Sequence, residues 1–178
     1  MSMSNLPDTD PLMREVMKSL AVRVQTSEDS LTRRHAIYLL AMTRNPACAE
    51  LFTRALRDPE KAVRAQAARA LADIGEPASG RLIELLRDPD WKVRYRAAEA
   101  LGMIKERTAV GPLIGLLSDE KDHVRYMAVK SLGAIGPAGS KHTIEAMLND
   151  ENNYVRDMAE EVLQERGVRT AGCLPKPG

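Results

Sequence analysis

The most regular feature of the sequence is an apolar stripe with the period of an α-helix. From residue 63 onward, apolar side chains recur after four, seven, eight and eleven positions, and this spacing places them on one helical face. The stripe consists of Val63, Ala67, Ala70, Leu71 and Ile74. The pattern predicts a helix with Asp58 as its cap, Pro59 at its first position and Gly75 as its stop.

A second apolar segment follows directly after this predicted helix. It begins near Pro77 and carries Leu82, Ile83, Leu85 and Leu86. The two segments together predict a pair of antiparallel helices of about 12 residues each, or about 18 Å in length. Because one pair cannot bury both of its apolar faces, we expect it to stack on neighbouring pairs.

The same unit recurs along the chain at a nearly constant interval. An aspartate, a valine and an arginine return together, and the valines are Val63, Val93, Val124 and Val155. These valines recur at intervals of about 30 residues, a period that indicates a helical solenoid. Small residues follow nine positions later at Ala72, Gly102 and Gly133, and we expect them to let adjacent helices approach closely.

A degenerate copy precedes these four units. Ala36 aligns with Ala67, and Leu40 with Leu71, at the same interval. We therefore predict an all-α fold, a right-handed α-solenoid of about five antiparallel helix pairs with HEAT-like repeats (period about 30–31). The predicted organisation is a single domain over 1–166, with pairs at about 10–44, 45–75, 76–105, 106–136 and 137–166, and a polar tail over 167–178.

The arginine after each repeat valine is predicted to have a structural role. In a stacked array it can reach the aspartate of an adjacent unit, because its planar fork bonds a carboxylate and loop carbonyls together. The predicted ladder sets Arg33, Arg64, Arg94, Arg125 and Arg156 beside Asp58, Asp88, Asp119 and Asp150.

Composition narrows the classes of function. The formal net charge is +1, whereas a general nucleic-acid binder more often carries a clear basic excess. Two cysteines, Cys48 and Cys173, are too few for a disulfide scaffold or a zinc ribbon, and we expect both to be free thiols. No apolar stretch approaches the length of a membrane span and the N-terminus does not resemble a signal peptide, so we predict a cytoplasmic protein with no membrane contact.

The recurring Asp-Pro-x-x-x-Val-Arg-x-x-Ala-x-x-Ala-Leu-x-x-Ile-Gly pattern resembles the HEAT-like repeat of the phycobilisome lyase (PBS lyase) family. The resemblance covers roughly residues 27–167. It implies the fold, but it leaves the activity open among bilin lyases, hydroxylases and adaptor proteins. The hydroxylases of this fold hold a di-iron centre with His-Glu pairs. Here the histidines are followed by other residues, in His35-Ala36, His123-Val124 and His142-Thr143, so that ligand set is absent.

The resemblance also implies that the helix bearing Val-Arg lines the concave face. Its outward positions are predicted to be two and one before the valine and two, three, six and ten after it. All four tyrosines and the only tryptophan fall on these positions. Because Tyr, Trp, Met and Arg are enriched at interface centres, we predict a partner-binding row. The row comprises Tyr38, Trp91, Tyr95, Arg96, His123, Tyr126, Met127, Tyr154 and Met158.

The same row carries a graded charge. Basic residues such as Arg34, Arg69 and Lys92 belong to the first three copies, and acidic residues such as Asp157 and Glu161 to the last. Charged residues of this kind are typical of a helix face that is exposed to solvent. The alternative is that they match a partner whose charges have the opposite polarity.

We therefore predict a non-catalytic protein–protein interaction scaffold or adaptor. Its partner is predicted to be another protein, an enzyme subunit or an assembly client, held by the concave face. Two alternatives stay open: a subunit of a bilin-lyase-like or other modifying enzyme, and a nucleic-acid binder with a basic concave patch. No catalytic residue, metal ligand or cofactor site is predicted, and formation of a homodimer is left open.

Overall fold

The computed structural model describes residues 10–136 and 139–165, and all of its regular elements are helical. The predicted tail over 167–178, with Cys173, lies outside the described residues. Ten α-helices occur within the described part. They are α1 (Pro11–Thr26), α2 (Ser30–Ala41), α3 (Ala49–Ala55), α4 (Lys61–Ile74), α5 (Ser79–Leu85), α6 (Trp91–Ile104), α7 (Val110–Gly115), α8 (Asp122–Ile135), α9 (Lys141–Ala146) and α10 (Asn153–Glu165).

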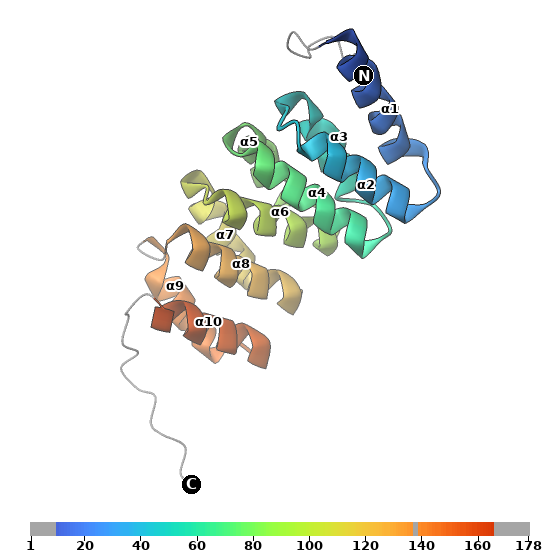
Figure 1. The fold of residues 1–178 in the computed structure, drawn as a ribbon. Helices are drawn as coiled ribbons and strands as arrows, with labels where there is room; N and C mark the ends of the chain where they lie inside the picture. Colours follow the sequence, from blue (N-terminus) through green and yellow to red (C-terminus); the bar gives the residue numbers. More distant parts are fainter. Residues whose placement is uncertain (1–9, 137–138, 166–178) are drawn as a thin grey trace.

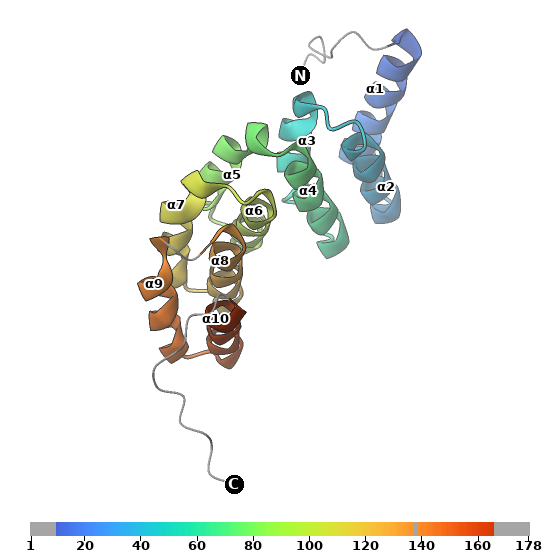
Figure 2. The same ribbon diagram turned by 60° about the vertical axis from the view of Figure 1, so that its left-hand side comes forward.

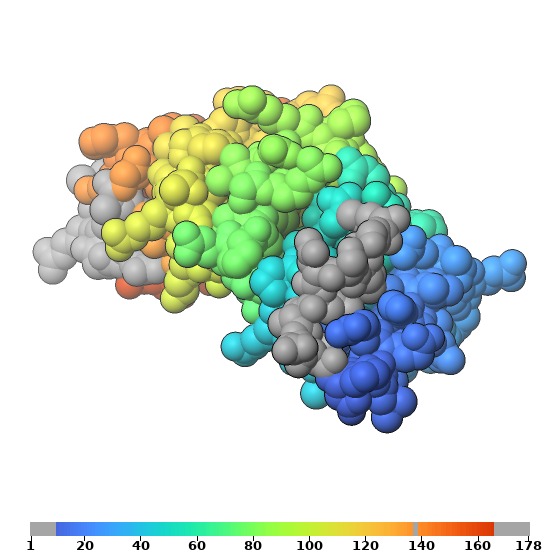
Figure 3. Space-filling view, turned by 90° about the horizontal axis from the view of Figure 1, so that it is seen from above, coloured from blue at the N-terminus to red at the C-terminus, as the bar shows by residue number. Residues whose placement is uncertain are grey.

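The helices form two curved layers. Figures 1 and 2 show the even-numbered helices side by side in one layer and the odd-numbered helices in the other. In Figure 2 the odd-numbered helices follow the outside of the curve, and the even-numbered helices line its inside. The space-filling view shows successive repeats following one another in sequence order, as expected for a solenoid (Figure 3). The predicted α-solenoid is confirmed.

The two helices of a pair differ more than the sequence predicts. The second helices are regular, and α4, α6 and α8 each have 14 residues. After α1, which has 16 residues, the first helices are short α-segments, such as the seven residues of α5, extended by 3-10 turns. These turns lie at Pro46–Cys48, Glu76–Ala78, Arg107–Ala109, Leu116–Ser118 and Met147–Asn149. The expectation of a continuous α-helix of about 12 residues is therefore wrong for α3 and α5, with seven residues each, and for α7 and α9, with six each.

The start of α4 also differs from the prediction. The helix begins at Lys61, so Pro59 lies in the preceding turn instead of at the first helical position. The Asp58 carboxylate accepts the N–H of Glu60 at 2.9 Å and thereby closes that turn. The predicted stop is confirmed, because Gly75 has φ 79°, a left-handed value that favours glycine.

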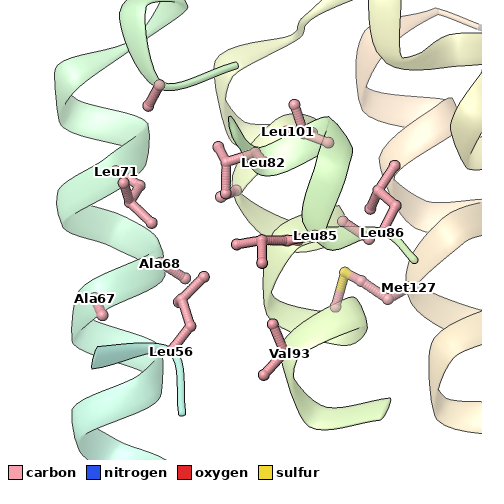
Figure 4. Close-up of a cluster of buried hydrophobic side chains, with 14 of the residues drawn as sticks. Leu56, Ala67, Ala68, Leu71, Leu82, Leu85, Leu86, Val93, Leu101 and Met127 are labelled. Atoms are coloured by element: carbon pink, nitrogen blue, oxygen red, sulfur yellow. The ribbon is translucent and has the colours of Figure 1, made fainter. Parts of the chain in front are cut away.

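The core runs continuously through the array between the two layers. Each repeat contributes its valine, alanines and leucine from the inner helix and leucines from the outer helix. Figure 4 shows one part of it, where Leu82, Leu85 and Leu86 meet Leu101 and Val93. The stacking therefore buries the apolar faces that a single pair would leave in water.

Small residues bring adjacent inner helices together, as predicted, at two junctions. A methyl group at Gly102 would lie 2.6 Å from Ser131 Oγ, and one at Gly133 would lie 2.6 Å from a Val162 methyl carbon. The Ser131 hydroxyl also donates to the Ala98 carbonyl at 2.8 Å and joins α8 to α6. These contacts fix the spacing of α6, α8 and α10.

The arginine–aspartate ladder forms at three of the four predicted rungs. Arg94 donates from Nε and Nη2 to the two oxygens of Asp119, at 2.7 and 2.8 Å, and from Nη1 to the carbonyls of Asp88 and Pro89. Equivalent forks join Arg33 to Asp58 and Arg125 to Asp150. Each rung ties one repeat to the next and anchors its own turn.

The second rung is a correction to the prediction. Arg64 donates only to the carbonyls of Asp58 and Pro59, and its Nε has no hydrogen-bond partner among the described residues. The carboxylate of Asp88 is bonded instead by Arg57. The physical reason is competition between two arginines. The guanidinium of Arg57 occupies the Asp88 carboxylate that Arg64 was predicted to bind.

Candidate functional site

The predicted row lies on the second helices, but its members differ in exposure. Tyr154, with 69% of its surface exposed, and Tyr38, with 53%, project into solvent, and His123 is also exposed. Trp91, Tyr95 and Tyr126 are half-buried and rest against the core. The aromatic residues therefore share the inner layer, and three of them also contribute to packing.

Three members of the row are not at the surface, which corrects their predicted outward position. Arg96, Met127 and Met158 are only 7%, 4% and 8% exposed. All three stand three positions after the repeat valine, so this position is buried in α6, α8 and α10. Figure 4 shows Met127 pointing from α8 into the core beside Leu86. Their predicted role in partner binding therefore has no direct surface to act through.

A pocket of about 230 Å³ lies over α6, α8 and α10. Three tyrosines, one histidine and two polar residues line it. We call it the aromatic pocket, and its lining residues are Tyr95, Asp122, His123, Tyr126, Asn152 and Tyr154. The first turns of α8 and α10 supply Asp122, His123 and Tyr154, so the spacing of these helices sets the shape of the pocket.

Hydrogen bonds fix the polar side of the aromatic pocket. One oxygen of Asp122 lies 2.7 Å from His123 Nδ1 and also accepts the backbone N–H of His123. The other oxygen accepts the side-chain amide of Asn152, which comes from the next repeat. The hydrogen bond from the His123 side chain, with that from its backbone, lowers the pKa of Asp122 despite partial desolvation. The carboxyl group is therefore ionised at neutral pH.

Trp91 borders the pocket without lining it. Its ring stacks at a tilt on His123, with centroids 5.5 Å apart. Arg96 pairs with Glu99 and lies 5.1 Å from the centroid of the Tyr95 ring, so its charge is already satisfied. Burial raises the pKa of Tyr95, with a further contribution from Glu99, so the phenol stays protonated and available as a donor.

A second hollow lies over α2 and α4 and has a different character. We call it the basic groove, about 430 Å³ in volume, and Arg34, His35, Tyr38, Ala62, Ala65, Gln66 and Arg69 line it. Tyr38 is thus separated from the other aromatics, because α4 presents Ala65 at the position where α6 and α8 carry Tyr95 and Tyr126. The predicted row is therefore two sites instead of one continuous surface.

The pocket contains two residues that the predicted row omits. Asp122 occupies an outward position two residues before the valine, so the spacing rule could have selected it. Asn152 stands one place earlier, where a turn residue is expected, and its backbone N–H does close a turn on Asp150. Only the stacked structure shows that its side-chain amide reaches Asp122 across the junction.

Metal-ligating side chains do not cluster within residues 10–136 and 139–165. No group of three or more His, Cys, Asp or Glu side chains in these ranges is arranged to hold a metal ion. Cys48 is buried, and burial raises the pKa of its thiol, which keeps the thiol protonated. None of the described helices is both long enough and apolar enough to cross a bilayer.

The sequence matches the HEAT repeat family over residues 17–81 and 79–164. A search of curated proteins found no significant match.

Solved structures with the same fold include one of moderate sequence identity. A chain from the complex of CpcE and CpcF of phycocyanin lyase from Nostoc sp. PCC7120 is 26% identical, with a TM-score of 0.63 over 93% of this chain and 68% of that one. A designed armadillo repeat protein in complex with the peptide (KR)4 is 19% identical, with a TM-score of 0.54 over 86% and 82%. Human deoxyhypusine hydroxylase in complex with glycerol is 19% identical, with a TM-score of 0.51 over 83% and 72%. The last two similarities concern the fold alone.

Proposed function

Because the chain belongs to the HEAT repeat family, we propose that it is a non-catalytic scaffold that binds another protein on its concave face. The observation that carries this proposal is the aromatic pocket. A chain with 3% aromatic residues places Tyr95, Tyr126 and Tyr154 around one hollow, with Trp91 at its border. Tyrosine and tryptophan bury much area with few rotors, which is why they dominate the centres of interfaces.

The charge along the inner layer supports a protein partner with defined polarity. The basic groove offers Arg34 and Arg69 over the first two repeats, while α10 exposes Asp157 and Glu161. Complementary charges of this kind set the direction in which a partner docks more than they set its affinity.

Two of the similar structures were solved as complexes. The chain from Nostoc belongs to a complex of CpcE and CpcF, and the designed armadillo repeat protein holds a peptide. The first of them supports another protein as the class of partner proposed for this chain.

The proposal is tested by capture with matched surface variants. The protein is immobilised and exposed to extract from the organism that produces it, beside Tyr154→Glu on the inner layer and Arg81→Glu on the outer layer. Both positions are exposed, so neither change should alter thermal unfolding. We expect a partner retained by the wild type and Arg81→Glu but lost by Tyr154→Glu, with the loss reproduced by the purified partner. Equal retention by both variants would contradict the concave face as the binding site.

A subunit of a bilin-lyase-like enzyme is a second candidate function, favoured by the similarity to the chain from phycocyanin lyase over 93% of this protein. The candidate predicts that the protein, alone or with a partner subunit, binds a bilin chromophore. Visible absorbance after mixing with a bilin and removal of the free pigment would test it, and a colourless protein would count against it.

Nucleic-acid binding stays a prediction, and the basic groove is the surface on which it would occur. If the protein binds DNA there, its affinity should fall steeply as the salt concentration rises, because the release of counterions dominates such binding. A DNA mobility-shift titration over a range of salt concentrations, with Arg34→Ala as the variant, would measure it; an absent shift would remove this alternative.

Self-association also stays a prediction. The first helix pair leaves several large apolar side chains exposed, among them Leu12, Leu31 and Leu39. Sedimentation velocity over a range of concentrations would test the homodimer, with a constant monomer mass as the contrary result.

A further inference from the structure

We propose that the aromatic pocket takes an arginine side chain from the partner protein. This inference deepens the proposed scaffold function and rests on it. The pocket combines three tyrosine rings with a carboxylate, and these are the groups that attract a planar cation in a partly desolvated site.

The charge of the residues that line the pocket determines whether a cationic or an anionic side chain can bind. Asp122 is the only lining residue of the pocket with a fixed charge at neutral pH, and His123 is the only other titratable group besides the tyrosines. A cation that enters therefore meets one negative charge and no fixed positive charge in the wall. An acidic side chain would meet the Asp122 carboxylate instead, which opposes its entry.

The carboxylate is both oriented and accessible. His123 and Asn152 hold its two oxygens from opposite sides, so the group is fixed before a ligand arrives. The Asp122 side chain is still 39% exposed, and the oxygen that accepts from Asn152 can accept a second hydrogen bond. The wall therefore presents free acceptor capacity to the N–H donors of a guanidinium.

The rings favour arginine over lysine. A guanidinium is flat and weakly hydrated, so it stacks on aromatic faces while its edge donates hydrogen bonds. The protein uses this pairing internally, where the Arg96 guanidinium lies 5.1 Å from the Tyr95 ring centroid. A volume of about 230 Å³ suits one side chain and not a folded segment, so the remainder of the partner would lie along the inner layer.

The single tryptophan allows a direct test. Trp91 stacks on His123, so its fluorescence and its indole N–H resonance report on the pocket wall. The probes are acetylated, amidated peptides of sequence Gly-Ser-Arg-Ser-Gly, with glutamine, glutamate or lysine in place of arginine. They are titrated into the full chain at neutral pH. We expect the arginine peptide to bind about fivefold or more tightly than the glutamine peptide.

Matched variants separate the pocket from general charge attraction. Asp122→Asn should weaken binding of the arginine peptide by roughly threefold to fivefold, and Tyr154→Ala by about threefold. Asp73→Asn removes one exposed negative charge from the same helix layer outside the pocket and should leave binding unchanged.

Three results would overturn the inference: equal binding of the arginine and glutamine peptides, equal binding of the arginine and lysine peptides, or equal losses in Asp122→Asn and Asp73→Asn. If the peptides fail in this way while Tyr154→Glu still loses the captured partner, the arginine inference falls and the scaffold function stands. If the peptides bind but no partner depends on Tyr154, the scaffold proposal falls instead.

Discussion

The α4–α6 junction and the two junctions after it, α6–α8 and α8–α10, are built from the same pattern but differ in how closely their inner helices approach. At the α6–α8 and α8–α10 junctions, Gly102 and Gly133 admit a neighbouring side chain to within 2.6 Å of where a methyl group would lie. At the α4–α6 junction the same register position is Ala72, which is partly exposed, and Arg64 does not reach the carboxylate of Asp88. The aromatic pocket lies over the tight junctions, and the basic groove lies before the weaker one.

This difference suggests why the aromatic residues occur where they do. A pocket whose walls come from three helices keeps its shape only if those helices keep their spacing. The glycine contacts and the Arg125–Asp150 fork supply that constraint. Preorganised walls reduce the ordering cost of binding, so a tight junction beneath a binding site favours affinity.

The largest expected effect comes from removing an intact rung. Arg94→Ala would leave the buried Asp119 carboxylate without its guanidinium, and breaking such a pair costs about 3–5 kcal/mol. Arg64→Ala removes hydrogen bonds to two carbonyls, with an expected cost of about 1–3 kcal/mol. Urea unfolding of the two variants measures both changes, and equal losses would contradict the difference between the junctions.

A methyl group at the tight junction should destabilise the protein. Gly102→Ala would set its methyl against Ser131 and is expected to cost about 1–3 kcal/mol through overpacking. The control is Gly80→Ala, where nothing lies within 4 Å of the added carbon, and there we expect no loss or a gain of up to about 1 kcal/mol. Thermal unfolding compares them. The tight-junction account fails if Gly102→Ala proves as stable as the control.

Acid should weaken the rung formed by Arg33 and Asp58. Burial raises the pKa of Asp58, but hydrogen bonds from Arg33 and the Glu60 N–H outweigh it, so the net shift is downward. The unfolded carboxyl group takes up its proton first, and the stabilisation present above about pH 4 is lost as the pH falls through the lower folded value. Melting temperatures between about pH 5 and pH 2.5 should fall, and less steeply in Asp58→Asn. A flat profile for the wild type would contradict this role.

The smallest expected effect on stability is at the rim of the pocket. Tyr154→Ala truncates a largely exposed ring and should change the free energy of unfolding by less than about 0.5 kcal/mol. Tyr126→Ala removes a half-buried ring that packs on the core and should cost more. Chemical denaturation ranks the two variants, and the reverse order would show that the exposure of these rings is misassigned.

The fold was predictable from sequence because its information is local and repeated. A valine at each period of the array, an apolar stripe and a stop such as Gly75 each act within one helix pair, and four copies confirm one another. The three intact rungs also followed, because the same two residue types recur at a fixed spacing.

The candidate site was less predictable because it depends on contacts between repeats. Helical periodicity alone places Met127 and Arg96 close to the exposed face, whereas both are buried in the stacked structure. Two hydrogen bonds likewise join residues of different repeats. Arg57 binds Asp88, and Asn152 binds Asp122. Nothing in a single repeat carries that information.

Site-specific photo-crosslinking tests the concave face most directly. Benzoylphenylalanine is introduced at Tyr154 on the inner layer and, in a separate variant, at Arg81 on the outer layer, and each protein is irradiated in extract of the native organism. We predict a discrete crosslinked protein from position 154 that is absent from position 81. The same adducts from both positions, or an adduct from position 81 alone, would contradict the proposal that the inner layer is the binding surface.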